Sequence, residues 1–176
     1  KDGKFLIVSN HPMGAADAIA LYHQIYPVRN DLFFFANELF VYLLGAFHEL
    51  LAPVVWNKEK ETHSANKVTL ERLGVFFGDN RPGIIFPSGR LSKLTFLGLW
   101  DRPWEKTPIA LAKKYKFPLI PVYVEGRNSW FFYFASYVNK QLRDISQLNE
   151  LFNKRGKEIS IKTVSYTHLT LPTRLL

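Results

Sequence analysis

The sequence predicts a single α/β domain with a largely parallel central sheet flanked by helices. Short apolar runs alternate along the chain with longer segments of helical character, which is typical of a parallel sheet buried between helices. Polar clusters that contain Gly or Pro follow several of these runs, as expected of loops at strand ends. The length of 176 residues suits one domain with a sizeable core.

The composition excludes several classes of protein. Hydrophobic residues make up 47% of the chain and aromatic residues 15%, which predicts a packed fold and excludes disorder. The absence of Cys excludes disulfides, Cys-based zinc sites and thiol nucleophiles. The formal net charge of +8 is compatible with an acidic partner or an anionic membrane surface. Because the Lys and Arg residues are dispersed and form no nucleic-acid-binding motif, we expect no nucleic-acid partner.

The first part of the chain predicts a strand followed by two helices. Phe5 to Val8 is a short apolar run that predicts a buried strand. A helix is predicted from Ala15 to Tyr26, with Asp17 in its first turn, where the helix dipole favours an acidic residue. A second helix is predicted from Asp31, which is a suitable N-cap, to about Leu51.

The longest apolar stretch, Leu32 to Phe47, lies within this second predicted helix. It spans 16 residues and is interrupted by Asn37 and Glu38, so it is too short and too polar to cross a bilayer. We expect either a buried core helix or a helix that lies in the plane of a membrane interface. Neither a signal peptide nor a transmembrane helix is expected.

The rest of the chain continues the alternation of strands and helices, with Gly, Pro and small polar residues at the element ends. The predicted elements are a strand from Val54 to Trp56, a helix from Thr62 or Ser64 to Phe77, a strand from Ile84 to Phe86, a helix from Thr107 to Tyr115, a strand from Leu119 to Val124, a helix from Lys140 to Asn153 and a strand from Glu158 to Lys162.

Residues 164–176 are excluded from this prediction. Val164 to Thr173 reads VSYTHLTLPT, which back-translates codon for codon into the end of a common transposase-based sequencing adapter. A match over ten consecutive codons is very improbable by chance, so we expect a read-through tail. Without it the chain loses one Arg, Arg174, and the net charge changes from +8 to +7. The chain begins at Lys1, and we expect the domain, residues 1–163, to be truncated at both ends.

Three of the predicted strands end in polar clusters. Functional residues of such sheets collect in the loops beyond the carboxyl ends of the strands, so the three clusters are expected to converge. They are Asn10-His11-Pro12-Met13-Gly14-Ala15-Ala16-Asp17, Phe86-Pro87-Ser88-Gly89-Arg90 and Val124-Glu125-Gly126-Arg127-Asn128-Ser129.

His11 and Asp17 are the candidate catalytic pair. The Asp17 carboxylate would accept a hydrogen bond from one ring nitrogen of His11, which leaves the other nitrogen free to take a proton from a substrate hydroxyl. The alternative is that His11 only caps the turn between strand and helix. Ser88 and Ser129 are not predicted to be nucleophiles, because neither lies in a G-x-S-x-G motif.

Arg90 and Arg127 are the candidates for binding an anion. A guanidinium group offers a rigid fork of donors to phosphate or carboxylate, and Gly89 and Gly126 would let the backbone approach a ligand closely. The alternative is that each Arg is a solvated surface charge.

These residues resemble the motifs of the glycerolipid and lysophospholipid acyltransferase family. That family has a His-x4-Asp catalytic motif, a later F-P-E-G-type motif and a proline-rich motif after a strand. The corresponding segments here are Asn10-His11…Asp17, Phe86-Pro87-Ser88-Gly89-Arg90 and Pro118-Leu119-Ile120-Pro121-Val122, in the family's order. The resemblance extends from about Phe5 to Thr163.

The sequence departs from the family pattern at two motifs. Five residues, and not four, separate His11 from Asp17, and Ser88 stands where the family usually has Glu. These features resemble a bacterial branch that carries the name hemolysin and includes acyltransferases that make ornithine- and glycine-type aminolipids. The family's arginine for glycerol phosphate has no clear counterpart near residues 56–58, which counts against a glycerol-phosphate acceptor.

The resemblance implies an O-acyltransferase. In such an enzyme, His11 deprotonates the hydroxyl of a lysolipid, a lyso-aminolipid or a lysophospholipid, which then attacks the thioester of acyl-CoA or acyl carrier protein. It implies no covalent acyl-enzyme, no metal and no other cofactor. The substrate-contacting residues that it implies are Asn10, Ser88, Gly89, Arg90, Arg127 and Asn128. The expected location is the cytoplasmic face of the inner membrane, as a peripheral or monotopic protein on an anionic membrane surface.

Two aromatic runs, Phe33 to Phe35 and Trp130 to Phe134, are predicted to be either membrane anchors or core residues. Two alternative functions remain open at this point. One is a non-catalytic membrane- or anion-binding domain, which the net charge and Ser88 would suit. The other is a His-Asp hydrolase that acts on lipid esters.

Overall fold

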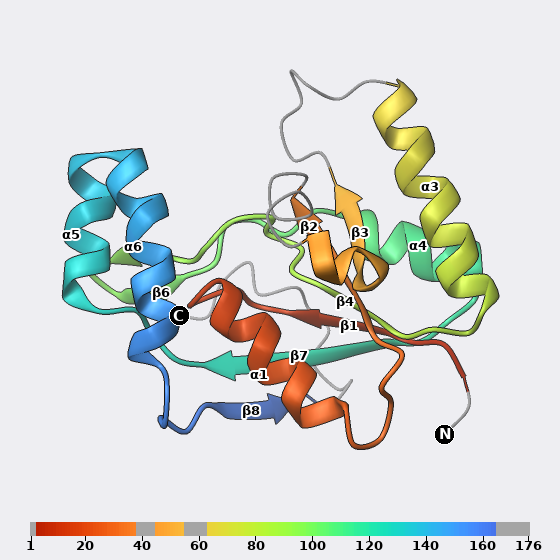
Figure 1. Ribbon diagram of the computed structural model, residues 1–176, viewed down its shortest axis with the longest axis horizontal. Helices are drawn as coiled ribbons and strands as arrows, with labels where there is room; N and C mark the ends of the chain where they lie inside the picture. Colours follow the sequence, from red (N-terminus) through yellow and green to blue (C-terminus); the bar gives the residue numbers. More distant parts are fainter. Residues whose placement is uncertain (1–2, 38–44, 55–62, 165–176) are drawn as a thin grey trace.

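A six-stranded sheet forms the centre of the computed structural model, which describes residues 3–37, 45–54 and 63–164 (Figure 1). All neighbouring strands of this sheet run parallel except the last, which pairs antiparallel with its neighbour. In spatial order the strands are β3 (Leu51–Val54), β2 (Phe33–Asn37), β4 (Gly83–Ile85), β1 (Leu6–Ser9), β7 (Leu119–Glu125) and β8 (Ser160–Thr163). The predicted α/β fold with a largely parallel sheet is confirmed.

Helices cover both faces of the sheet, and a small hairpin extends from one end of the molecule (Figure 1). The helices are α1 (Ala15–Ile25), the 3₁₀ helix η1 (Gly45–Leu50), α3 (His63–Gly78), α4 (Thr107–Tyr115), α5 (Trp130–Val138) and α6 (Lys140–Asn153). The hairpin consists of two antiparallel strands, β5 (Lys93–Thr95) and β6 (Gly98–Trp100). No helix in the described part of the chain is both long enough and apolar enough to cross a membrane.

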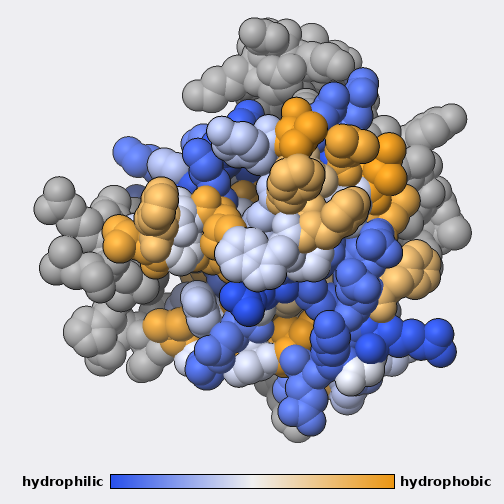
Figure 2. Space-filling view, turned by 90° about the vertical axis from the view of Figure 1, so that its left-hand side faces the viewer, coloured by the Kyte–Doolittle hydropathy of each residue, from blue (hydrophilic) through white to orange (hydrophobic). Residues whose placement is uncertain are grey.

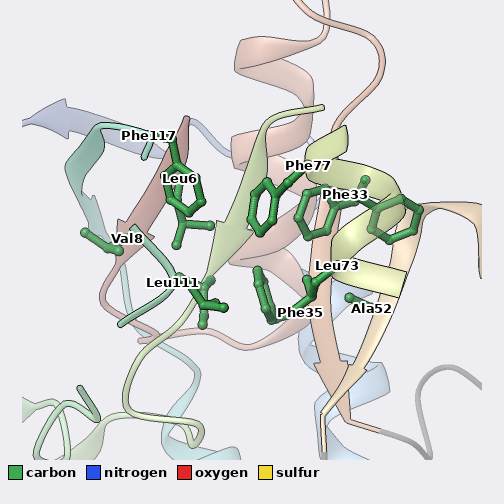
Figure 3. Packing of buried hydrophobic residues seen from close by; sticks show 11 residues of the cluster. Leu6, Val8, Phe33, Phe35, Ala52, Leu73, Phe77, Leu111 and Phe117 are labelled. Atoms are coloured by element: carbon green, nitrogen blue, oxygen red, sulfur yellow. The ribbon is translucent and has the colours of Figure 1, made fainter. Parts of the chain in front are cut away.

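The strand β1 divides the core into two layers because successive side chains of a strand point to opposite faces. Leu6 and Val8 contribute to one hydrophobic cluster, and Ile7 contributes to another. The first cluster lies between the sheet and helices α3 and α4, and its aromatic rings pack against one another (Figure 3). The second cluster lies under α1. The sheet is therefore buried on both faces, as parallel sheets usually are.

The predicted helix from Asp31 to Leu51 is wrong. Residues 33–37 form strand β2 and residues 45–50 form η1, whereas residues 38–44 lie outside the described part. Phe33 is fully buried and Phe35 is 6% exposed, because β2 lies between β4 and β3. Short, fully apolar runs suit a buried strand as well as a buried helix, so periodicity cannot separate the two. The run from Phe33 to Phe35 is therefore core and not a membrane anchor.

Most other elements lie close to their predicted bounds. Helices α4 and α6 coincide with the predicted ranges, and α4 has Pro at its start and ends at Lys116 in the left-handed conformation, with a φ of 52°. Strand β3 ends at Val54, where the predicted strand began, and Trp56 lies outside the described residues. Helix α5 and the β5–β6 hairpin were not predicted as secondary structure.

Candidate functional site

The polar clusters that follow β1, β4 and β7 meet at one edge of the sheet. These three strands are adjacent and parallel, so their carboxyl ends lie together. The side chain of His11 lies 3.0 Å from that of Asp17, measured from Nδ1 to Oδ2. The His11 side chain is 19% exposed, whereas the Asp17 side chain is fully buried. The pair therefore has one buried member and one member that solvent or substrate can reach.

The first turn of α1 holds the Asp17 carboxylate in place. Asp17 Oδ2 accepts hydrogen bonds from the backbone N–H groups of Met13 and Gly14, both at 2.9 Å. Gly14 has a φ of 83°, which favours Gly and lets the chain curl around this oxygen. Because Oδ2 acts as an acceptor, His11 Nδ1 carries the proton. Within the described residues, Nε2 has no hydrogen-bond partner and is available as a base.

Three further contacts fix the position of His11. Its ring stacks on Phe86, with the ring centroids 4.0 Å apart and the planes inclined by 23°. Its backbone N–H donates to Asp101 Oδ1 at 3.2 Å, and its carbonyl accepts from Ser92 N–H at 2.8 Å. Asp101 also accepts from the Ser92 hydroxyl and from Trp104 Nε1. Residues after β4 therefore contact both the ring and the backbone of His11.

The end of β7 is joined to the same loop. The side-chain amide of Asn10 donates to the Val124 carbonyl at 2.9 Å and accepts from the Val124 N–H at 2.7 Å. These two side-chain bonds join the end of β1 to β7 beyond the last pair of the strand ladder, Ser9 and Val122. A Cβ atom at Gly126 would overlap the thioether of Met13, so a larger residue here would force the Met13 side chain to move. Asn10, predicted to contact substrate, is thus engaged in joining two strands.

The predicted residues after β4 differ in their surroundings. Ser88 is 9% exposed, and its hydroxyl donates to the Arg90 carbonyl at 2.8 Å within the same turn. Gly89 occupies the left-handed region with a φ of 60°. The guanidinium of Arg90 is exposed and has no hydrogen-bond partner among the described residues. Ser88 and Gly89 therefore shape the turn, and Arg90 is free to bind an anion.

The cluster after β7 contains an unusual buried side chain. Asn128 is 4% exposed, and neither atom of its side-chain amide has a hydrogen-bond partner among the described residues. Its backbone N–H donates to the Tyr133 hydroxyl at 3.1 Å. Burial raises the pKa of the Tyr133 phenol, and the charges of Glu150 and Asp17 raise it further, against the opposing effects of Asn128 and Arg127. Asp17 and Arg127 therefore both lie within electrostatic reach of Tyr133.

A buried carboxylate ties the start of α5 to α6. Glu150 is 1% exposed and accepts from the Ser129 N–H at 2.8 Å, from the Ser129 hydroxyl and from Lys154 Nζ at 3.1 Å. Burial alone would raise the pKa of Glu150, but the Ser129 donors and Lys154 outweigh it and hold that pKa below its ordinary value. The segment that carries Arg127 and Asn128 is therefore anchored on its distal side.

A hollow of about 800 Å³ lies elsewhere, between α1, α6 and β8. Its lining includes Ile19, His23 and Arg155, but not His11, Asp17, Ser88 or Arg90. We therefore locate the candidate site by the polar side chains at the strand ends and not by this hollow.

Comparison with known proteins assigns the family of this chain. A family model described as "Acyltransferase" matches residues 1–170. The chain belongs to the acyltransferase family.

Two curated relatives carry the same name, Lyso-glycine lipid O-acyltransferase. One, from Bacteroides thetaiotaomicron, is 30% identical over 168 residues, which are 92% of this chain and 60% of the relative. The other, from Phocaeicola vulgatus, is 30% identical over 143 residues, which are 81% of this chain and 49% of the relative. The chain thus spans 60% or less of the length of these acyltransferases.

Several residues of the candidate site were not found from the sequence. Asp101, Ser92 and Glu150 stand in no recognisable motif, and their spacing from His11 carries no signal. Glu150 lies on a helix and resembles an ordinary solvated residue until the fold buries it. Phe86 belongs to the motif from Phe86 to Arg90, but its stacking on His11 depends on the register of β1 against β4.

Proposed function

We propose that this acyltransferase moves a fatty acyl group from acyl-CoA or acyl carrier protein to the hydroxyl of a lysolipid at a membrane surface. The observation that carries the proposal is the pairing of a partly exposed His11 with a fully buried Asp17 at the edge of the parallel sheet. The names of the two curated relatives support a lysolipid as the acceptor.

His11 acts as the general base of the proposed reaction. Asp17 keeps the proton on Nδ1, so the lone pair of Nε2 faces away from the carboxylate and can accept a proton. A group that both orients a His and stabilises its protonated form is the usual supporting partner of such a base. The stacked Phe86 ring limits rotation of the imidazole, which preserves the direction of Nε2.

The proposed transfer balances without a covalent enzyme intermediate. The acceptor hydroxyl gives its proton to His11 Nε2 while its oxygen forms a bond with the thioester carbonyl carbon. The carbon–sulfur bond then breaks, and the leaving thiolate takes the proton back from His11. The products are an ester and a free thiol, and the base returns to its starting state.

Three residues are proposed to bind the substrates. Arg90 and Arg127 are both exposed and offer guanidinium groups to a phosphate or carboxylate. Asn128 has a buried amide whose donor and acceptor are both unpaired within the described residues. A buried unpaired amide costs free energy, and a hydrogen bond from a polar group of the acceptor would recover it.

The proposed reaction takes place at an anionic membrane on the cytoplasmic side of the inner membrane. Without the expected tail the net charge is still +7, which supports attraction to anionic lipids, and the lysolipid acceptor lies in the membrane.

The test is acyl transfer by the full-length protein. Labelled acyl-CoA and labelled acyl carrier protein are each offered against lyso-glycine lipid, lyso-ornithine lipid and lysophosphatidic acid in vesicles. We expect label in one lysolipid, and we expect His11→Ala to lower the rate by about 10²–10⁴-fold, the usual contribution of a general base.

His23→Ala is the matched control, because His23 lies exposed on α1 and outside the site. It should retain the wild-type rate. Transfer that survives His11→Ala would remove His11 from the mechanism. Vesicle binding without transfer from either donor would instead favour a non-catalytic lipid-binding domain, and free fatty acid formed without an acceptor would favour a hydrolase.

A further inference from the structure

The tip of the β5–β6 hairpin exposes two large hydrophobic side chains to solvent. Phe96 is fully exposed and Leu97 is 85% exposed. The tip is not a loose loop, because the Thr95 hydroxyl donates to the Gly98 carbonyl and accepts from the Leu97 N–H. The fold therefore holds two apolar side chains in water at a fixed place, which costs free energy unless a partner covers them.

The base of this hairpin is bonded to the catalytic histidine. Ser92, directly before β5, donates its N–H to the His11 carbonyl, and Asp101, directly after β6, accepts the His11 N–H. A partner that binds Phe96 and Leu97 therefore lies at a fixed distance and orientation from His11.

A second exposed apolar surface begins on the other side of the site. Helix α5 starts two residues after Asn128, and its exposed residues recur at helical spacing, so they form one stripe; helix α6 has a similar stripe. The exposed residues of α5 are Trp130, Phe131, Phe134, Tyr137 and Val138, and those of α6 are Leu142, Ile145, Leu148 and Phe152. Of the run Trp130 to Phe134, only Phe132 is fully in the core.

The hairpin and the two helices lie at the same end of the molecule. In Figure 1 the labels of α5, α6 and β6 stand together at the left, and strands β1 and β7 point toward that end with their carboxyl ends. Figure 2 looks at this end and shows several groups of hydrophobic side chains on the surface, the largest at the upper right. The candidate site and both apolar surfaces therefore share one end.

The charges around the hairpin match an anionic partner. Between residues 90 and 102 the charged residues are Arg90, Lys93, Asp101 and Arg102. Asp101 accepts hydrogen bonds from three neighbours, so the exposed charges of this segment are all basic. Trp100 is 37% exposed beside Lys93 on the paired strand. Aromatic and basic side chains around an apolar tip are the combination that suits the headgroup layer of an anionic bilayer.

We propose that the Phe96–Leu97 tip and the exposed stripes of α5 and α6 insert together into the interfacial layer of an anionic bilayer. His11 would then lie between two inserted elements, at the level where a lysolipid presents its hydroxyl. The inference rests on the proposed function for the identity of the acceptor, but the docking itself is measured without any reaction.

The first test measures binding of the full-length protein to vesicles of phosphatidylcholine with and without phosphatidylglycerol. The double variant Phe96→Ser/Leu97→Ser should bind anionic vesicles at least about tenfold more weakly, because burial of one such side chain contributes a factor of about ten or more. The matched control is Leu70→Ser/Val75→Ser on α3, where the two residues are 44% and 60% exposed. Helix α3 lies at the opposite end of the molecule in Figure 1, so this control should bind as the wild type does.

The α5–α6 surface is tested by Phe131→Ser/Phe134→Ser in the same assay, together with the molecular mass in the absence of lipid. We expect a comparable loss of binding and an unchanged mass. Wild-type binding by either the tip variant or the α5 variant would overturn the proposal. The proposal would also be overturned if the α3 control lost binding equally. It would be overturned as well if the wild type were a dimer and the α5 variant became a monomer without losing vesicle binding.

Transfer assays then separate docking from chemistry. The tip variant should lose transfer to a lysolipid carried in vesicles, yet retain wild-type transfer to a short-chain lysolipid dissolved as monomers. Loss of both would mean that the tip serves the reaction itself and would overturn its role as a docking element. If the wild type transfers to neither acceptor, the proposed function fails, while the vesicle-binding result still decides the docking proposal.

Discussion

At the scale of single residues, the site depends on where buried polar atoms find partners. Asp17 is fully buried, and its Oδ2 receives His11 and two backbone N–H groups, whereas Oδ1 has no partner within the described residues. Among the described residues, Oδ2 is therefore the carboxylate oxygen that orients His11.

The first prediction concerns the charge of this carboxylate. Asp17→Asn keeps the size of the side chain and an oxygen for the Met13 and Gly14 donors, but it removes the negative charge that stabilises protonated His11. We expect the turnover number to fall by about 10²–10⁴-fold with little change in KM. Circular dichroism should show an intact fold. A variant with near wild-type turnover would show that Asp17 only caps α1.

The second prediction contrasts two asparagines that the sequence placed in the same class. Asn10 makes two hydrogen bonds to Val124, whereas the side chain of Asn128 makes none within the described residues. Asn10→Ala should lower the free energy of unfolding by about 1–3 kcal/mol, because it leaves two partly buried backbone groups unpaired. Asn128→Ala should not lower that free energy, but it should raise KM for the lysolipid.

Urea denaturation and steady-state kinetics on both variants check this contrast. Equal destabilisation by the two substitutions would mean that Asn128 has a structural partner. An unchanged KM in Asn128→Ala would remove Asn128 from the acceptor site.

At the scale of elements, the start of α5 is held by hydrogen bonds from its N-cap residue, Ser129, to the buried carboxylate of Glu150 on α6. Glu150 receives both donors of Ser129 together with Lys154, and these outweigh the effect of burial and lower its pKa from the ordinary value of 4.5. A carboxyl group with a lowered pKa in the folded state stabilises the fold at pH values above its unfolded pKa. That stabilisation is lost as the pH falls through the folded value.

The third prediction follows from the lowered pKa of Glu150. In the wild type, the free energy of unfolding should decrease as the pH falls from about 5 to about 3, and Glu150→Gln should show a smaller decrease over that range. At neutral pH the variant should be less stable by about 1–3 kcal/mol, because the Ser129 and Lys154 donors lose a charged acceptor. Parallel stability curves for the two proteins would show that Glu150 does not contribute to the acid sensitivity.

At the scale of the whole molecule, the sequence predicted the parallel sheet and the convergence of three strand ends. It did not predict strand β2, the β5–β6 hairpin or the exposure of α5. The polar clusters after β1, β4 and β7 were found because parallel strands bring their carboxyl ends together. Strand β2 was taken for a helix, since Phe33-Phe34-Phe35 has neither helical nor strand periodicity and its burial is set by β3 and β4.

The parts that sequence could not supply depend on contacts between distant segments. The β5–β6 hairpin has three residues in each strand, too few for a pattern, and the hydrogen bonds of its base to His11 reach across the sequence to Ser92 and to Asp101, the latter 90 positions away. The exposure of α5 was likewise undetermined, because an aromatic run fits a core as well as a surface until the neighbouring elements are known.

The most direct test of the account is the release of free thiol from acyl-CoA or acyl carrier protein, followed with and without the lysolipid acceptor. Direct attack by a hydroxyl that His11 activates predicts thiol release only when the acceptor is present, with one thiol formed for each acylated lipid and almost none in His11→Ala. A burst of thiol without acceptor would reveal a covalent acyl-enzyme, and steady release with free fatty acid would reveal a hydrolase. Either result would contradict the mechanism derived from the His11–Asp17 pair.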